Sequence, residues 1–145
     1  MPLLSIQSTS VFFLLFMPTN TEDLTSLTAL GRSSKPARTL ETFPNHAPGN
    51  LEVTLHCTEF TCLCPKTGQP DYAEIEISYI PSKLVVESKS MKLYLETYRN
   101  VGVFHEHLAV DIGKDFVKFI RPKSVSVTVK FRTRGGIAID AVWHN

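Results

Sequence analysis

Residues 124–140 read Ser-Val-Ser-Val-Thr-Val-Lys-Phe-Arg-Thr-Arg-Gly-Gly-Ile-Ala-Ile-Asp, and this stretch decides the fold. From 124 to 131, apolar side chains alternate strictly with Ser, Thr and Lys. Such alternation is typical of a strand that buries one face. A Gly-Gly pair at 135–136 interrupts the pattern, and Ile137 and Ile139 then resume it. The stretch therefore predicts two neighbouring strands of an antiparallel sheet.

Two earlier stretches show the same period. Apolar residues alternate with polar ones from Leu51 to Cys57, and again from Tyr72 to Tyr79. The segment 81–83, Pro-Ser-Lys, ends the second of these predicted strands.

Helical periodicity occupies the middle of the chain. Ser88 stands where an N-cap is expected, and the apolar positions that follow recur at i, i+3, i+4 and i+7, which predicts a helix ending near residues 100–102. A second predicted helix covers residues 104–120 and ends before Pro122. The order ββααββ predicts an α+β fold, a four-stranded antiparallel sheet with two helices on one face. So thin a core leaves sheet edges for other subunits to pair, which favours a homo-oligomer.

The whole-chain numbers restrict the class of protein. At 145 residues the chain is long enough for one domain with one core. Its formal net charge of +1 argues against an extended basic surface for binding nucleic acid or an anionic membrane. Three cysteines, at 57, 62 and 64, cannot form a disulfide framework, so a cytoplasmic location is predicted.

The amino-terminal third lacks a sustained period. Residues 1–16 include an apolar run shorter than the about 20 residues that a bilayer requires. We interpret them as an upstream extension, with Met17 as an alternative start and a weak export signal as the lesser alternative. Residues 17–50 predict an irregular arm with a short helical turn near 24–30, and residues 51–145 form the predicted catalytic domain.

Residues 60–71 read Phe-Thr-Cys-Leu-Cys-Pro-Lys-Thr-Gly-Gln-Pro-Asp, and the two prolines and the glycine predict a rigid loop. A doubled-back loop would bring the thiol of Cys64 and the carboxylate of Asp71 onto one small substrate. Two interpretations remain open at this point. The loop is either a reactive site or a tight connection whose cysteines pack in the core.

Four motifs together resemble one enzyme family. The octapeptide 87–94, Glu-Ser-Lys-Ser-Met-Lys-Leu-Tyr, resembles the signature of the 7-cyano-7-deazaguanine reductases, which are nitrile reductases of queuosine biosynthesis. Residues 64–71 look like their catalytic loop, and residues 104–106 and 134–136 match two further motifs. The resemblance covers residues 24–143 and is closest to the single-module form. It implies the tunnelling fold, whose ββααββ units assemble into a multi-subunit barrel with active sites between subunits.

The resemblance also implies a mechanism. A nitrile carbon is a weak electrophile, so its reduction calls for covalent activation by a thiolate. Cys64 would add to the nitrile to form a thioimide, and Asp71 would act as the general acid. This role requires Asp71 to hold a proton near neutrality, which burial favours. Two hydrides from NADPH would complete the reduction of 7-cyano-7-deazaguanine to the aminomethyl product.

Further site residues follow from the same match. Glu106 suits the guanine-like edge of the substrate, because a carboxylate accepts two N–H donors. The predicted substrate-binding residues are Val86, Glu87, Ser88, His105 and Glu106. For NADPH, the helix start favours phosphate and a guanidinium suits the phosphate that distinguishes NADPH from NADH. The predicted cofactor-binding residues are Ser88, Lys89, Arg134 and Gly135, and no metal is predicted.

Three alternatives remain. A hydrolase resembling GTP cyclohydrolase would use Cys62, Cys64 and either His105 or His107 as zinc ligands. An amidinotransferase that makes archaeosine from the same nitrile would share the thiol but lack the NADPH signature. A catalytically silent oligomeric scaffold is the third. Cys62 is interpreted as a packed or partly exposed thiol, with a thiol partner or a metal ligand as its alternative roles.

Overall fold

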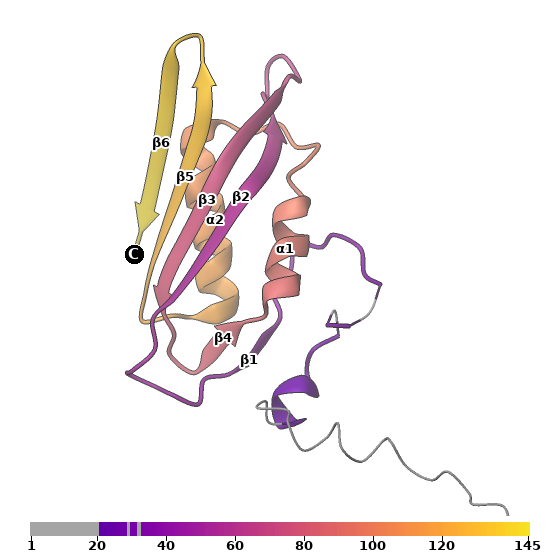
Figure 1. The fold of residues 1–145 in the computed structure, drawn as a ribbon, viewed down its shortest axis with the longest axis vertical. Helices are drawn as coiled ribbons and strands as arrows, with labels where there is room; N and C mark the ends of the chain where they lie inside the picture. The colour runs from indigo at the N-terminus through magenta and orange to yellow at the C-terminus, as the bar shows by residue number, and fades with distance from the viewer. Residues whose placement is uncertain (1–20, 29, 32) are drawn as a thin grey trace, which may run out of the picture.

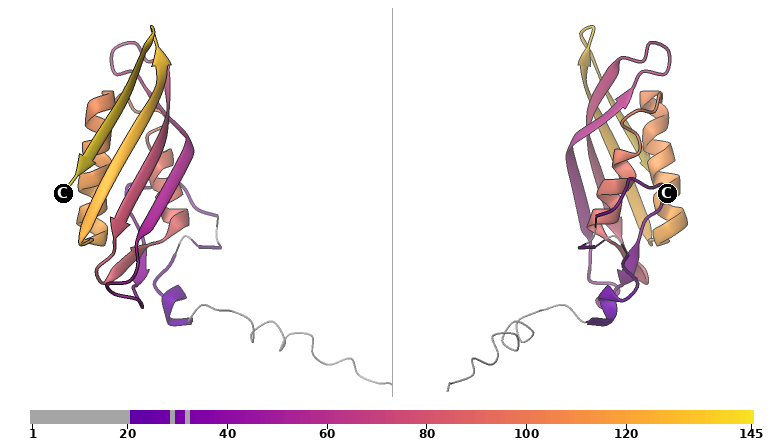
Figure 2. Two further views of the ribbon diagram at one scale, coloured as in Figure 1. Left: turned by 60° about the vertical axis from the view of Figure 1, so that its left-hand side comes forward. Right: turned by 90° about the vertical axis from the view of Figure 1, so that its right-hand side faces the viewer.

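The computed structural model describes residues 21–28, 30–31 and 33–145, so the predictions for residues 1–16 lie outside the described part of the chain. Four strands form one antiparallel sheet in the order β2-β3-β5-β6. The helices α1 and α2 cover one face of this sheet, and Figures 1 and 2 show the sheet and the helices as two layers. The bounds are β2 Val53–Leu63, β3 Pro70–Ile80, α1 Ser88–Glu96, α2 His105–Ile120, β5 Ser124–Arg134 and β6 Ile137–His144. The predicted ββααββ order and α+β class are confirmed.

The core lies between the helices and the sheet, because the alternating strands and the apolar helix faces bury the same side. The rings of Tyr79 on β3 and Phe116 on α2 meet edge to face at 4.8 Å between centroids. Gly113 lets α2 approach β6, since a Cβ there would lie 2.0 Å from Cε3 of Trp143. No helix in the described part of the chain is long and apolar enough to cross a membrane.

The first two strands of the large sheet are longer than predicted. β2 continues from Val53 through a register shift between Cys57 and Phe60 and reaches Leu63. The expected loop therefore shrinks to residues 64–69 between β2 and β3. The irregularity in β2 breaks the two-residue period that sequence reasoning relies on, which is why the strand ended too early in the prediction.

The start of α1 differs by one residue from the prediction. Its N-cap is Glu87, not Ser88, and the Glu87 carboxylate accepts hydrogen bonds from the backbone N–H groups of Lys89 and Ser90. The helix also ends at Glu96, about one turn before the predicted end. α2 agrees closely with its prediction, and Arg121 ends it in a left-handed conformation with φ of 51°.

The arm is less irregular than predicted. A two-stranded antiparallel sheet joins β1 (Thr42–Pro44) to β4 (Leu84–Val86), and sequence reasoning missed both strands. A 3₁₀ helix covers Thr21–Leu24, and its last residue begins the segment 24–30 where at most a short helical turn was expected. The guanidinium of Arg38 lies 3.7 Å from the ring centroid of Tyr98, which fixes the arm on the helical layer.

Candidate active site

Cys64 follows directly on β2 and begins a closed turn. Its backbone N–H donates to the carbonyl of Gln69 at 2.8 Å, and its carbonyl accepts from Gly68 at 2.9 Å. Gly68 has φ of +70°, a left-handed conformation that glycine adopts without strain. On the other side, a Cβ on Gly102 would lie 2.8 Å from Cα of Pro65, so the next segment packs tightly against the turn. The nucleophile candidate thus stands on a rigid support.

The two neighbouring thiols differ in character. The Thr67 hydroxyl and the backbone N–H groups of Thr67 and Lys66 donate to the Cys64 sulfur and lower the pKa of Cys64. Burial, the Asp71 carboxylate and Cys64 raise the pKa of Cys62 to about 11. Because the thiolate is the reactive form, Cys64 is the better nucleophile and Cys62 remains a buried thiol.

Asp71 is the centre of the site. Its side chain is 3% exposed at the start of β3, directly opposite Cys62 in the sheet register. Oδ1 pairs with Nη1 of Arg134, and Oδ2 lies 3.1 Å from Nε2 of His105. The His105 ring in turn stacks on Phe131, with centroids 3.6 Å apart and planes 10° apart. The buried carboxylate is therefore held on both oxygens.

The fold brings four of the predicted residues together at one end of the molecule. They come from the β2–β3 loop, β3, the start of α2 and the end of β5, which meet at the upper end in Figure 1. They are Cys64, Asp71, His105 and Arg134. Glu106 is exposed beside His105, and Gly135 lies in the adjacent β5–β6 turn with φ of +58°. The Asp71 carboxylate raises the pKa of Cys64, against the hydrogen bonds that lower it.

The other predicted residues lie at the opposite end, where β4 leads into α1 (Figure 1). They are Val86, Glu87, Ser88 and Lys89. The Glu87 side chain is buried, and its oxygens lie 2.8 Å from the Lys89 nitrogen and 2.6 Å from the Ser90 nitrogen. The helix start was predicted to offer free N–H groups to a phosphate, but Glu87 already occupies these two.

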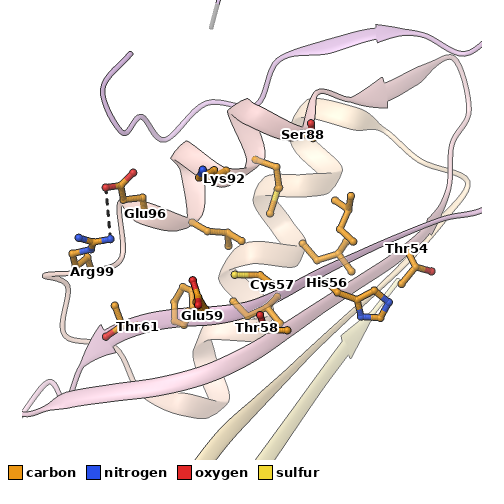
Figure 3. Close-up of a pocket in the computed structure, with 16 residues that line it drawn as sticks. Thr54, His56, Cys57, Thr58, Glu59, Thr61, Ser88, Lys92, Glu96 and Arg99 are labelled. Atoms are coloured by element: carbon orange, nitrogen blue, oxygen red, sulfur yellow. Dashed lines mark ion pairs between the residues drawn. The ribbon is translucent and has the colours of Figure 1, made fainter. Parts of the chain in front are cut away.

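A cavity lies apart from the Cys64–Asp71 end of the molecule. A groove of about 640 Å³ runs between α1 and β2, as Figure 3 shows, and it is lined by Cys57, Lys92 and Arg99 among others. Of the predicted site residues, Ser88 alone is among its described lining residues. β2 is an edge strand of the sheet, so the groove borders a row of backbone groups without a partner strand within the described chain.

The described residues contain no group of three or more His, Cys, Asp or Glu side chains arranged to hold a metal ion. Sequence reasoning missed three contributors to the site. Thr67 and Gln69 shape the turn and contact Cys64 or Arg134, and Phe131 supports His105. Thr67 carried a usable signal, because Ser and Thr in turns hydrogen-bond nearby backbone.

Comparisons with known proteins show which family this chain belongs to. The family model described as "QueF-like protein" matches residues 70–145, more than half of the chain. The chain belongs to the QueF-like protein family. Among its relatives, the NADPH-dependent 7-cyano-7-deazaguanine reductase of Syntrophus aciditrophicus is 55% identical over 81% of this chain and 85% of its own. The protein of the same name from Frankia casuarinae is 51% identical over 80% of this chain and 93% of its own.

A solved QueF-like structure supports the fold. The apo archaeosine synthase QueF-Like is 29% identical, with a TM-score of 0.61, over 65% of this chain and 92% of that chain. The resemblance read from the motifs is thus confirmed at the level of the family.

Proposed function

We propose that this QueF-like protein is an NADPH-dependent 7-cyano-7-deazaguanine reductase. Relatives of that name at 46–55% identity support the reaction. The observation that carries the proposal is the pairing of an activated thiol, Cys64, with a buried carboxyl group, Asp71. A nucleophile beside a proton donor is what addition to a carbon–nitrogen triple bond requires.

The proposed chemistry uses the chain's own groups as follows. The Cys64 sulfur bonds to the nitrile carbon while the nitrile nitrogen takes a proton from Asp71, which gives a thioimide. NADPH, when bound, supplies two hydrides to that carbon in succession. Once the carbon is reduced the first time, the electron pair on nitrogen forms an imine and expels Cys64 as a thiolate. The second reduction leaves an electron pair on nitrogen that takes a second proton, giving the amine.

Two protons are consumed, and we assign both to Asp71. His105 lies 3.1 Å from the carboxylate and its side chain is 18% exposed. It therefore connects the buried acid to water and can return the first proton before the second is needed. The stacking of His105 on Phe131 holds the ring in the position that this relay requires.

Part of the NADPH site fits the residues present. The Arg134 side chain is 42% exposed beside the open β5–β6 turn, so its guanidinium can reach a phosphate. In this structure it pairs with Asp71 and with Oε1 of Gln69 at 2.5 Å. A phosphate would withdraw Arg134 from Asp71, so the guanidinium cannot serve both partners fully at once. We propose that Arg134, Gly135 and Lys89 hold the cofactor phosphates.

We further propose that the active site forms between subunits of a cytoplasmic homo-oligomer. The predicted substrate residues Glu87 and Ser88 stand at the opposite end from Cys64 and Asp71 (Figure 1). One chain therefore cannot place both groups on one small substrate. The sheet has two edge strands, β2 and β6, and joining an edge of one chain to the other edge of the next extends the sheet head to tail.

Subunit mixing tests this arrangement. Cys64→Ala and Glu87→Gln each damage one end of the protomer, so each pure variant should be inactive or strongly impaired. Refolding the two together should restore about a quarter of wild-type activity, because a random head-to-tail neighbour pair has both intact ends in one case of four. Sedimentation establishes that mixed oligomers have formed. Mixed oligomers without recovered activity would contradict the arrangement.

The reaction itself is tested by mixing the protein with 7-cyano-7-deazaguanine and NADPH. Oxidation of two NADPH per nitrile and formation of the aminomethyl product are expected. Omitting NADPH should leave the covalent thioimide, seen as a new ultraviolet absorbance and a mass increase equal to the substrate. An amidinotransferase would form the adduct but oxidise no NADPH. The 29% identity to the archaeosine synthase, against 55% to a reductase, supports the reductase.

A further inference from the structure

Arg134 makes contacts that its proposed role as a phosphate ligand does not explain. One amino group of its guanidinium, Nη1, pairs with Oδ1 of Asp71, and the other, Nη2, donates to Oε1 of Gln69 at 2.5 Å. The Arg134 side chain is 42% exposed, whereas the Asp71 side chain is 3% exposed. A cation that solvent can reach therefore covers one oxygen of the buried carboxylate that is the proposed proton donor.

Gln69 holds this guanidinium from the turn that carries the proposed nucleophile. Its backbone carbonyl accepts a hydrogen bond from the Cys64 N–H at 2.8 Å, so Gln69 belongs to the closed turn. Its side chain accepts from Arg134, which is followed directly by Gly135 and Gly136 with φ of +58° and +82°. Two acceptors, one on Asp71 and one on Gln69, thus fix the planar fork of the arginine.

The ion pair restricts where Asp71 can carry a proton. A guanidinium has N–H donors and no acceptor, so the O–H of a carboxyl group cannot point at it. Oδ1 is therefore an unprotonated acceptor while Arg134 is in place. Oδ2 lies 3.1 Å from Nε2 of His105, a ring nitrogen that donates or accepts according to its own protonation. Arg134 thus favours the ionised carboxylate, which cannot act as a general acid.

The other titratable groups that face Asp71 carry no fixed positive charge. Cys62 lies opposite Asp71 in the register of β2 and β3, and burial is the main cause that raises the pKa of Cys62 to about 11, so this thiol is neutral at pH 7. Cys64 is a thiol or a thiolate, and the His105 ring is charged only when protonated. Arginine, in contrast, stays protonated in proteins. If Arg134 leaves, burial favours the neutral acid form of Asp71.

We propose that Arg134 and Gln69 form an acid lock, which holds Asp71 ionised until an anion takes the guanidinium of Arg134 away. Gln69 is the positioning residue of this lock. After release, the Asp71 carboxylate takes up one proton from water by way of His105 and becomes a general acid. The inference rests on the proposed function for its anion, which is the cofactor phosphate. Phosphate binding is then the event that makes the proton donor available, so the nitrile is activated fastest when the reductant is already bound.

The test observes the protonation of Asp71 without nitrile and without NADPH. Infrared difference spectra at pH 7 detect the carbonyl band of a protonated carboxyl group, and its loss in Asp71→Asn assigns the band to this residue. Arg134→Gln should show the band without any ligand, because the permanent positive charge is gone. Arg134→Lys, which keeps a positive charge, should not show it. Arg99→Gln is the matched control, because Arg99 pairs with Glu96 at the surface, and its spectrum should equal that of the wild type.

Adenosine 2′,5′-bisphosphate tests the release of the lock. It carries the phosphate that distinguishes NADPH from NADH, and it has no hydride to transfer. Added to the wild type, it should produce the band together with the uptake of about one proton per bound molecule. Adenosine, which has no phosphate, should produce neither. Absence of the band in Arg134→Gln, or in the wild type at every bisphosphate concentration, would overturn the proposal.

Gln69→Leu tests the positioning role while Arg134 and Asp71 stay intact. The variant removes the side-chain acceptor but keeps the backbone carbonyl that closes the turn. The guanidinium should then be released more easily, so the band should appear at about 3–10-fold lower bisphosphate concentration than in the wild type. An unchanged concentration would show that Gln69 does not position Arg134.

The acid lock and the proposed reaction fail separately. With nitrile and without NADPH, Arg134→Gln should form the thioimide about 3–10-fold faster than the wild type at pH 7, since the rate follows the fraction of Asp71 that holds a proton. If the infrared results are as expected but the wild type forms no adduct, the lock stands and the reductase function is wrong. If the wild type reduces the nitrile but Arg134→Gln shows no band, the function stands and the lock is wrong.

Discussion

Replacing Cys64 with alanine is expected to abolish nitrile reduction and the covalent adduct together. The variant loses the only sulfur whose pKa the turn lowers, so the nitrile has no activated nucleophile. Loss of a covalent nucleophile typically costs at least about 10⁴-fold in rate. Turnover is measured by NADPH oxidation, and the adduct by intact mass and ultraviolet absorbance.

Cys62→Ala is the matched control, because it makes the same change two residues earlier in the chain. The buried Cys62 packs in the core, so its loss should lower the melting temperature while the thioimide still forms at Cys64. Retention of the adduct in Cys64→Ala, or its disappearance only in Cys62→Ala, would show that Cys64 is not the nucleophile.

The long strands could be predicted from the sequence, because a long alternation of apolar and polar residues indicates a strand with one buried face. β5 and β6 follow this pattern and were predicted, with α2, close to their observed bounds. The three-residue strands β1 and β4 are too short for any period to appear, so the small sheet that ties the arm to the body was missed. Only a tertiary contact makes those residues strands.

The candidate active site could be predicted from the sequence only in part. Seven positions separate Cys64 from Asp71, and a Pro- and Gly-containing turn brings them to one place. The contact of Arg134 with Asp71 was not predicted, because it depends on the register of β3 against β5. Sequence reasoning assigned Arg134 to a phosphate, and the structure adds a competing partner for the same guanidinium.

The Glu87 cap shows a different kind of limit. Ser88 and Glu87 are adjacent, and a serine is the common N-cap residue, so propensity favoured Ser88. The observed cap is the carboxylate one residue earlier, and it fills N–H groups that had been assigned to a cofactor phosphate. A shift of one residue thus changed a functional inference, whereas the existence of the helix was unaffected.

Asp71→Asn is expected to change two measurements in opposite directions. The amide keeps the shape of the side chain but cannot deliver the acid's proton, so thioimide formation should slow about 10²–10⁴-fold, the usual range for a general acid. While Asp71 is ionised, before it takes up a proton, its negative charge raises the pKa of Cys64, so removing that charge should lower the pKa of Cys64 further. Iodoacetamide should then alkylate Cys64 at lower pH than in the wild type.

This pair of results separates two roles for the carboxylate. If Asp71 were the base that deprotonates Cys64, its loss would slow alkylation and thioimide formation together, and the general-acid assignment would be wrong. If it feeds a proton to the nitrile nitrogen, the thiol becomes more reactive while the reaction with the nitrile fails. Asp140→Asn removes an exposed carboxylate on β6 and should change neither measurement. The opposite signs cannot arise from partial unfolding, because unfolding removes the donors that lower the pKa of Cys64.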